Sequence, residues 1–159
     1  MIFCQLEVQQ SRPKVVVGLS FSALAMLYSV MLIGVYITAS HQGISCPDWP
    51  LCPNGLGLPE EKYFFEHYHR LMVVITSGLV YAIAAYTVKS AHAARKTAVI
   101  AAIVMSVQIV LGMFVVKTSL QPLVVAAHLS NGILLFAMML MTFLTSYRFV
   151  RKHRESTTL

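Results

Sequence analysis

Four long apolar stretches constrain the fold of this chain more strongly than any other feature. They cover about residues 15–38, 64–88, 97–116 and 123–147. Each can cross the hydrocarbon core of a bilayer, which needs about 20 helical residues. Charged residues make up only 11% of the 159-residue chain, and the remainder is too short for a separate soluble domain. We therefore predict an all-α fold in which residues 1–159 form a single integral membrane domain.

The first apolar stretch could be mistaken for a secretory signal peptide. It follows about a dozen polar residues, and it exceeds the roughly 7–15 apolar residues of a signal peptide. We therefore expect it to stay in the protein as a membrane anchor.

The basic residues fall mostly on one side of a four-span topology. Nine of the twelve precede the first span, join the second to the third, or follow the fourth: Arg12, Lys14, Lys89, Arg95, Lys96, Arg148, Arg151, Lys152 and Arg154. The positive-inside rule then places both termini in the cytoplasm and the 40–63 loop outside, in the periplasm or at the exterior of a prokaryotic cell. Membrane topology thus accounts for the net charge of +6, and we expect no nucleic-acid partner.

The connections between the spans predict how the helices are arranged. Those near residues 89–96 and 117–122 are short, which is typical of antiparallel neighbours in an up-down-up-down four-helix bundle. The loop at about 40–63 is longer and rich in Pro and Gly, and loops of that length usually carry function.

Glu66, His69 and Arg70 form a charged cluster where the second span begins. Ionisable groups at the edge of hydrocarbon are costly and usually bind or react with something. Residues three apart share a helix face, so Glu66 and His69 can meet one ligand. A helix N-terminus also favours an acid for electrostatic reasons alone, but a carboxylate beside an imidazole suits proton transfer.

Two histidines are predicted to lie at the same depth. His69 and His128 each follow about five residues after the outer end of a span, roughly 7 Å below the surface at 1.5 Å per residue. Level imidazoles inside a four-helix bundle can be axial ligands of a haem iron, with Arg70 as a propionate partner. Hydrogen bonding between helices is the alternative. Zinc is disfavoured because no further ligand is placed at that depth.

The other histidines are not expected to bind a ligand. His67 is expected to be an interfacial side chain, because it points to a different face from His69. His41, His92 and His153 lie in or beside loops, and we expect them to be solvated.

The spans also suggest an internal repeat. Gly34 and Gly112 lie in the spans that precede the two histidine-bearing spans. A tandem repeat of helix pairs is one interpretation of this pattern.

Cys46 and Cys52 lie in the exported loop, where a disulfide can form and persist. A structural disulfide is favoured over a pair that exchanges electrons with a thiol partner, because nothing nearby clearly acidifies a thiol. Cys4 is expected to be cytoplasmic and free.

Several of these segments together resemble haem A synthase. They are the loop HQGISCPDWPLCPNG, the EHYHR that follows it, QIVLGMFVV in the third span and PLVVAAHLSNG in the fourth. The similarity is clearest over about residues 30–135. Members of that family commonly have eight membrane helices in two similar halves, and this chain resembles one half, as shorter prokaryotic versions do.

The resemblance implies specific roles for the residues singled out above. His69 and His128 correspond to the pair that coordinates haem iron, and Glu66 to the carboxylate needed for reaction. Cys46 and Cys52 correspond to the outer-loop disulfide, implicated in haem handling. Haem b is implied as a cofactor beside the haem O substrate, and a homo-oligomer would restore the second haem site of the long form. His41 and Gln42 stand where relatives tend to have small residues.

The resulting hypothesis is an enzyme that oxidises a methyl group of haem O to the formyl group of haem A for terminal cytochrome oxidases. Haem O synthase and an electron acceptor are the expected partners, since the oxidation releases four electrons and no nicotinamide or flavin motif is present. Two alternatives stay open. A b-type cytochrome would use only the histidines, and a thiol oxidoreductase would use only the cysteines.

Overall fold

A computed structural model describes residues 2–46, 49–50, 52, 55, 57 and 59–157, with helical side chains from residue 14 on except at positions 153 and 157. The described part of the chain contains four α-helices, one short 3-10 helix and no strand. Their bounds are α1 Ile2–Ala39, η1 Glu61–Tyr63, α2 Phe64–Lys89, α3 Arg95–Lys117 and α4 Pro122–Thr157. Each α-helix includes a segment long and apolar enough to cross a membrane, which confirms the predicted all-α membrane fold.

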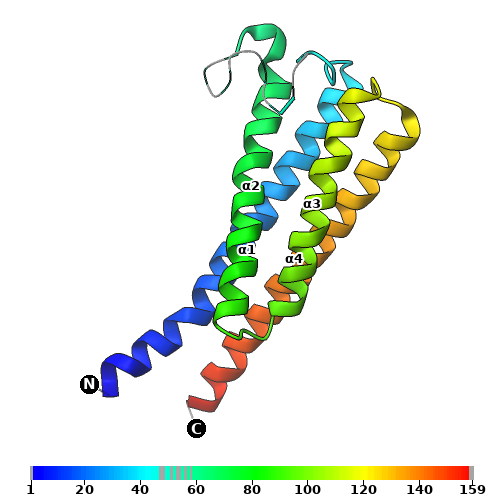
Figure 1. The fold of residues 1–159 in the computed structure, drawn as a ribbon. Coiled ribbons are helices and arrows are strands. Elements are labelled where there is room, and N and C mark those ends of the chain that lie inside the picture. Colours follow the sequence, from blue (N-terminus) through cyan, green and yellow to red (C-terminus); the bar gives the residue numbers. More distant parts are fainter. Residues whose placement is uncertain are drawn as a thin grey trace.

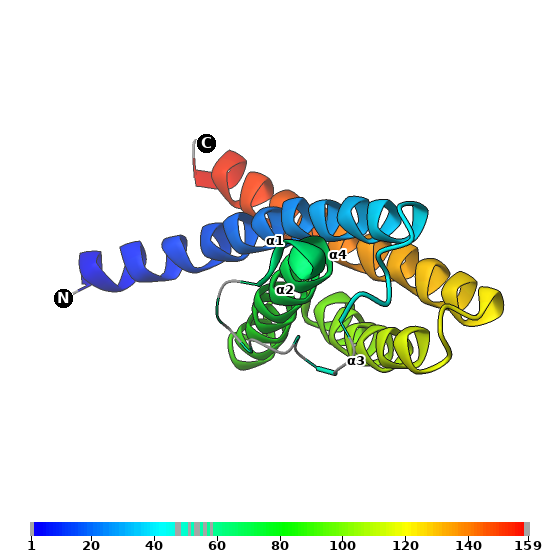
Figure 2. The same ribbon diagram turned by 90° about the horizontal axis from the view of Figure 1, so that it is seen from above.

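The helices form a closed ring in which each packs against two neighbours (Figures 1 and 2). The packed pairs are α1 with α2, α2 with α3, α3 with α4, and α1 with α4. Among the described residues, the diagonal pairs α1/α3 and α2/α4 are not in close backbone contact. The two termini lie together at the end of the bundle opposite the loop that joins α1 to α2. The up-down-up-down arrangement therefore places the starts of α2 and α4 at one end.

The first and last helices are longer than the predicted spans. Helix α1 begins at Ile2, within the polar residues that precede the first predicted span, and α4 continues to Thr157, beyond the predicted end of the fourth span near residue 147. Hydropathy marks only the part of a helix that lies in hydrocarbon, whereas Arg, Lys, Gln and Glu are good helix formers in water. An exposed ion pair between Arg151 and Glu155, with 3.3 Å between Nε and Oε1, spans one turn of the α4 extension. Helix length was thus underestimated at both ends.

Small side chains allow the helices to approach closely in the core. Ala23 of α1 and Ala101 of α3 have no exposed surface, and they pack in one cluster with Ile83, Leu135 and Met139. In hydrocarbon there is little hydrophobic drive between helices, so close packing of small residues contributes much of the association energy. The core cluster extends along the half of the bundle nearest the termini and leaves the opposite half to the polar residues described below.

Hydroxyl and amide side chains in the spans are satisfied locally or between helices. Thr142 of α4 donates to the Met138 carbonyl oxygen at 2.9 Å and lies 3.0 Å from the Thr97 hydroxyl oxygen of α3. The hydroxyl oxygens of Tyr81 and Ser106 are 2.9 Å apart and join α2 to α3. Such bonds offset the cost of placing polar atoms in hydrocarbon. The Ser106 hydroxyl thus bonds between helices.

We predict that Ala101→Leu destabilises the bundle by about 1–3 kcal/mol, because extra methylene groups at a fully packed helix contact force the helices apart. Ala82→Leu is the matched control, since Ala82 is an exposed residue of α2 that faces away from the core. Thermal unfolding in detergent should show a lower midpoint for Ala101→Leu only. Equal midpoints for the two variants would contradict the packing described here.

Candidate haem site and outer-loop carboxylate

His69 of α2 packs against a glycine of the neighbouring helix. A Cβ atom added to Gly34 of α1 would lie 3.1 Å from Cε1 of the His69 ring. The ring also bonds to the backbone carbonyl of Val30, one turn earlier in α1. Its Nδ1 atom is buried and has no hydrogen-bond partner among the described residues. The absence of a side chain at Gly34 therefore creates the space that the imidazole occupies.

His128 of α4 repeats this arrangement on the other helix pair. A Cβ atom added to Gly112 of α3 would lie 3.3 Å from Cε1 of the His128 ring. The side-chain amide of Gln108 donates to Nε2 of His128 at 3.2 Å, because the Gln108 Oε1 atom accepts from Asn131 at 2.7 Å. The ring also bonds to the backbone carbonyl of Gln108, as the His69 ring does to that of Val30. Its Nδ1 atom is buried and has no partner in the described part of the chain.

The two imidazoles occupy equivalent places in the diagonal helices α2 and α4, each against a glycine of the preceding helix. Buried polar atoms without partners are rare and call for an explanation. No group of three or more His, Cys, Asp or Glu side chains that could hold a metal ion occurs among the described residues. A pair of imidazoles with unpartnered nitrogens, each seated on a glycine, fits the donor set of a bis-histidine haem.

The pairing of Gly34 with His69, and of Gly112 with His128, supports the interpretation as a tandem repeat. In each pair a glycine near the outer end of one helix receives a histidine near the outer start of the next. The surroundings differ between the pairs. The side-chain amides of Gln108 and Asn131 lie beside His128. The polar groups near His69 are instead the charged side chains of Glu66 and Arg70. The repeat is therefore one of geometry and not of chemistry.

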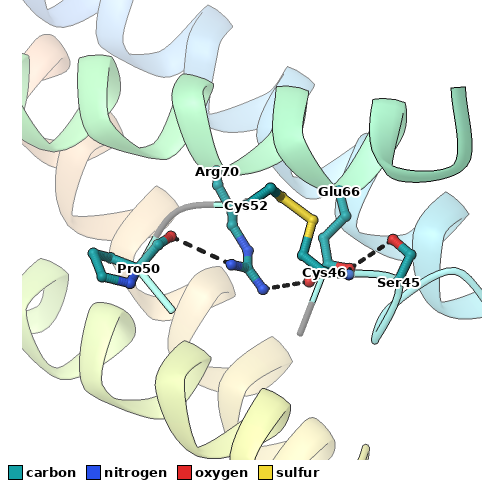
Figure 3. The surroundings of a disulfide bond; sticks show 6 residues. All are labelled: Ser45, Cys46, Pro50, Cys52, Glu66 and Arg70. Carbon is teal, nitrogen blue, oxygen red and sulfur yellow. Dashed lines mark hydrogen bonds and ion pairs between the residues drawn. A yellow bond between two sulfur atoms is a disulfide. The ribbon is translucent and has the colours of Figure 1, made fainter. Parts of the chain in front are cut away.

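Glu66 lies in the first turn of α2 and is only 4% exposed. Its Oε2 atom accepts from the Ser45 hydroxyl at 2.8 Å and from the Cys46 backbone N–H at 2.9 Å. Its Oε1 atom accepts from Arg70, four residues later in the same helix, at 2.5 Å. Both oxygens of the carboxylate are thus held by donors, and Figure 3 shows these bonds around the disulfide.

Arg70 contacts two parts of the structure at once. Its Nη2 atom pairs with Glu66, and its Nη1 atom donates to the Pro50 carbonyl oxygen of the outer loop at 3.4 Å. The guanidinium therefore connects the start of α2 to the loop that covers it (Figure 3). The structure brings Arg70 to the cluster predicted from the sequence, with Glu66 as its closest partner.

Cys46 and Cys52 are joined in a disulfide, with their Cα atoms 5.1 Å apart. The two residues are 1% and 4% exposed, so the bond is covered from solvent. It closes a short loop against the first turns of α2 (Figure 3). Residues 47, 48 and 51 of the CPDWPLC motif lie outside the described residues. The described part of the motif places a covalent link directly beside the Glu66 carboxylate.

Two histidines are more buried than the sequence indicated. His67 was expected at the interface, yet it is 2% exposed and neither ring nitrogen has a partner among the described residues. Helix periodicity could not show this burial, because it depends on how other segments pack against α2. His92 was expected to be solvated, but it is 8% exposed. Its Nδ1 accepts from the Ala94 N–H at 3.1 Å, and burial lowers its pKa.

The remaining histidines agree with their expected roles or cannot be compared with them. His41 is exposed at the end of α1, as expected. The side chains of His153 and Cys4 lie outside those that the structure describes.

Comparison with known proteins gives one family and two relatives. A model of the COX15-CtaA family, described as "Cytochrome oxidase assembly protein", matches residues 56–158. The chain is 29% identical to Heme A synthase of Shewanella oneidensis over 134 residues, which cover 72% of this chain and 41% of that protein. It is 30% identical to Protoheme IX farnesyltransferase of Haloarcula marismortui over 121 residues, which cover 75% of this chain and 26% of that protein. The chain thus spans less than half the length of either curated relative.

We predict that Cys46 and Cys52 resist thiol labelling until a reductant is added, because the disulfide joins them. Denatured membranes treated with maleimide-polyethylene glycol should show one label per chain before reduction and three after, since the chain has three cysteines. A Cys4→Ser variant should show none before reduction and two after. Three labels on the unreduced native chain would contradict the disulfide.

Proposed function

Because this chain belongs to the COX15-CtaA family of cytochrome oxidase assembly proteins, we propose that it acts as a haem A synthase. The proposed reaction oxidises a methyl group of haem O to the formyl group of haem A, which terminal cytochrome oxidases use. The observation that carries the proposal is the pair of half-buried imidazoles, His69 and His128, each with a buried Nδ1 atom that has no partner among the described residues, and with the buried Glu66 at the same end of the bundle. The similarity to Heme A synthase of Shewanella oneidensis supports it.

In this proposal His69 and His128, from α2 and α4, would hold the iron of the substrate, haem O. Gly34 and Gly112 support it, because each glycine keeps an imidazole in place without a competing side chain. Coordination through Nε2 of His128 requires the Gln108 amide to release that atom. The bound haem supplies the redox chemistry of its iron, and the protein supplies orientation and electrostatics. Haem b is the proposed resident cofactor, and haem O is the substrate.

Glu66 is proposed as the catalytic carboxylate. It takes up a proton from the methyl group or stabilises positive charge that develops there. Its contacts favour the second role, because three donors already point at its two oxygens. A carboxylate prearranged by donors needs little reorganisation when charge develops nearby. Arg70 is proposed to pair with a haem propionate from the mouth of the site, since a guanidinium suits carboxylates.

Conversion of a methyl to a formyl group releases four electrons and four protons when water supplies the oxygen atom. An external electron acceptor must therefore take the electrons in two or more steps. Substrate would come from an enzyme that adds the farnesyl group to protohaem IX, the activity named in the second relative. We place the site near the outer face of a prokaryotic cell membrane, with both termini cytoplasmic. A homo-oligomer would supply a second haem site per assembly.

The two alternative functions explain less of the structure. A b-type cytochrome accounts for the histidines but gives no role to a buried carboxylate with donors on both oxygens. A thiol oxidoreductase needs an accessible disulfide, whereas Cys46 and Cys52 are almost fully buried. The synthase is the function that uses the imidazoles, the carboxylate and the loop together.

We predict that Glu66→Gln retains bound haem but lowers haem A formation at least about 100-fold, because it removes charge stabilisation at the reacting methyl. The protein should be purified after co-expression with a haem O-forming enzyme, and its haems extracted and identified. Haem O alone is expected from the variant, and haem O with haem A from the native chain. Haem b alone in both would favour the cytochrome, and full activity of the variant would remove the role of Glu66.

We predict that Gly34→Ala weakens haem binding about tenfold, because the new Cβ displaces the His69 imidazole, and changing a residue that orients a metal ligand commonly costs about 10–100-fold in affinity. Gly78→Ala in α2 is the matched control, since a Cβ there meets nothing within 4 Å. Titration of purified protein with haem, followed by absorption spectroscopy, measures the difference. Identical affinities for the two variants would contradict His69 as an iron ligand.

A further inference from the structure

We propose that Ser45 is a positioning residue for Glu66, and that the disulfide-closed outer loop exists in part to present it. The inference rests on the proposed function of Glu66 and adds a second element to the site. The carboxylate is on α2, but two of its three donors come from the loop that follows α1, 20 and 21 residues earlier in the chain. The reactive group is therefore assembled from two separate segments.

The loop donors and the helix donor hold different oxygens of the carboxylate. Arg70 lies one turn along the same helix and bonds Oε1, which alone would leave the carboxylate free to swing about the outer χ angles. The Ser45 hydroxyl and the Cys46 N–H both bond Oε2, at 2.8 and 2.9 Å. With both oxygens held from opposite sides, one orientation of the carboxylate is selected (Figure 3). This is the geometry expected of a preorganised group.

The position of Ser45 is in turn fixed by backbone contacts and by the disulfide. The Gln42 N–H donates to the Ile37 carbonyl at 2.9 Å, and the Ser45 N–H donates to the Gln42 carbonyl at 3.2 Å, so the chain turns directly off the end of α1. The next residue, Cys46, is 1% exposed and covalently joined to Cys52. Ser45 is thus held between a helix end and a covalent link, with little freedom to move away from Glu66.

A purely structural role for the same bond makes a different prediction. If the bond between Ser45 and Glu66 only fastened the loop, its loss would loosen the outer end of the bundle and weaken haem binding. If it orients the carboxylate, its loss leaves haem binding intact and slows the reaction, because small displacements of a catalytic group cost rate. The two roles therefore separate in KM and kcat.

The test uses the full-length protein in detergent or membranes, with haem O as the added substrate. Ser45→Ala removes the hydroxyl, and Ser45→Thr keeps it. Ser40→Ala is the matched control, because its hydroxyl lies at the same end of the bundle and, within the described part of the chain, bonds the Ile37 carbonyl at 3.3 Å and not Glu66. Glu66→Gln is run beside them. The readouts are haem O affinity by absorption titration, and KM and kcat for haem A formation.

We expect Ser45→Ala to lower kcat about tenfold, the scale of losing one hydrogen bond to a charged group, with haem O affinity unchanged. Ser45→Thr and Ser40→Ala should stay near the native kcat. Native kcat in Ser45→Ala beside an inactive Glu66→Gln overturns the positioning role alone. Loss of haem O binding in Ser45→Ala also overturns it, in favour of a structural role. Native activity in Glu66→Gln overturns the proposed function itself, whatever Ser45→Ala does.

Discussion

The cost of leaving a polar atom unpaired in hydrocarbon governs this structure. Hydroxyl groups bond back to their own helices or to a neighbouring helix, as Thr142 does with the Met138 carbonyl and with Thr97. Asn131 bonds Gln108, which bonds His128. Such pairing is nearly complete in folded proteins, yet His67, His69, His92 and His128 each keep at least one buried nitrogen without a partner among the described residues. Of these four, His69 and His128 are the two whose rings lie against a glycine of the preceding helix.

The two candidate iron ligands, His69 and His128, occupy equivalent positions in the bundle but have different surroundings. His69 lies near the charged pair Glu66 and Arg70, which bonds to the outer loop. His128 lies beside the amides of Gln108 and Asn131 within the bundle. Two imidazoles with different neighbouring groups suit a site that must hold a haem in one orientation. An enzyme that oxidises one methyl group out of several needs such asymmetry, because only the methyl near Glu66 would react. The outer loop supplies much of it through Ser45 and Cys46.

Several features of the site could be predicted because they depend on local spacing and depth. The shared depth of His69 and His128 follows from counting residues along two helices that run in the same direction, and the proximity of Glu66 to His69 follows from the helix period. The burial of His67 and His92 could not be predicted in this way. Burial of this kind depends on other segments of the chain, as where Phe149 of α4 packs on the His92 ring with 5.4 Å between the ring centroids. Helix periodicity carries no information about such cover.

The sequence by itself determined that four helices are long and apolar enough to cross a membrane, which end carries the cluster of Glu66, His69 and Arg70, and which side chains are chemically unusual there. These conclusions follow from hydropathy, charge and the 1.5 Å rise of a helix. Only the tertiary structure decided that Gly34 and Gly112 seat the two imidazoles and that Ser45 and the Cys46 N–H hold the Glu66 carboxylate. The reason is physical, because each of these contacts joins residues on different segments, and the distance between them depends on how the helices and the loop pack.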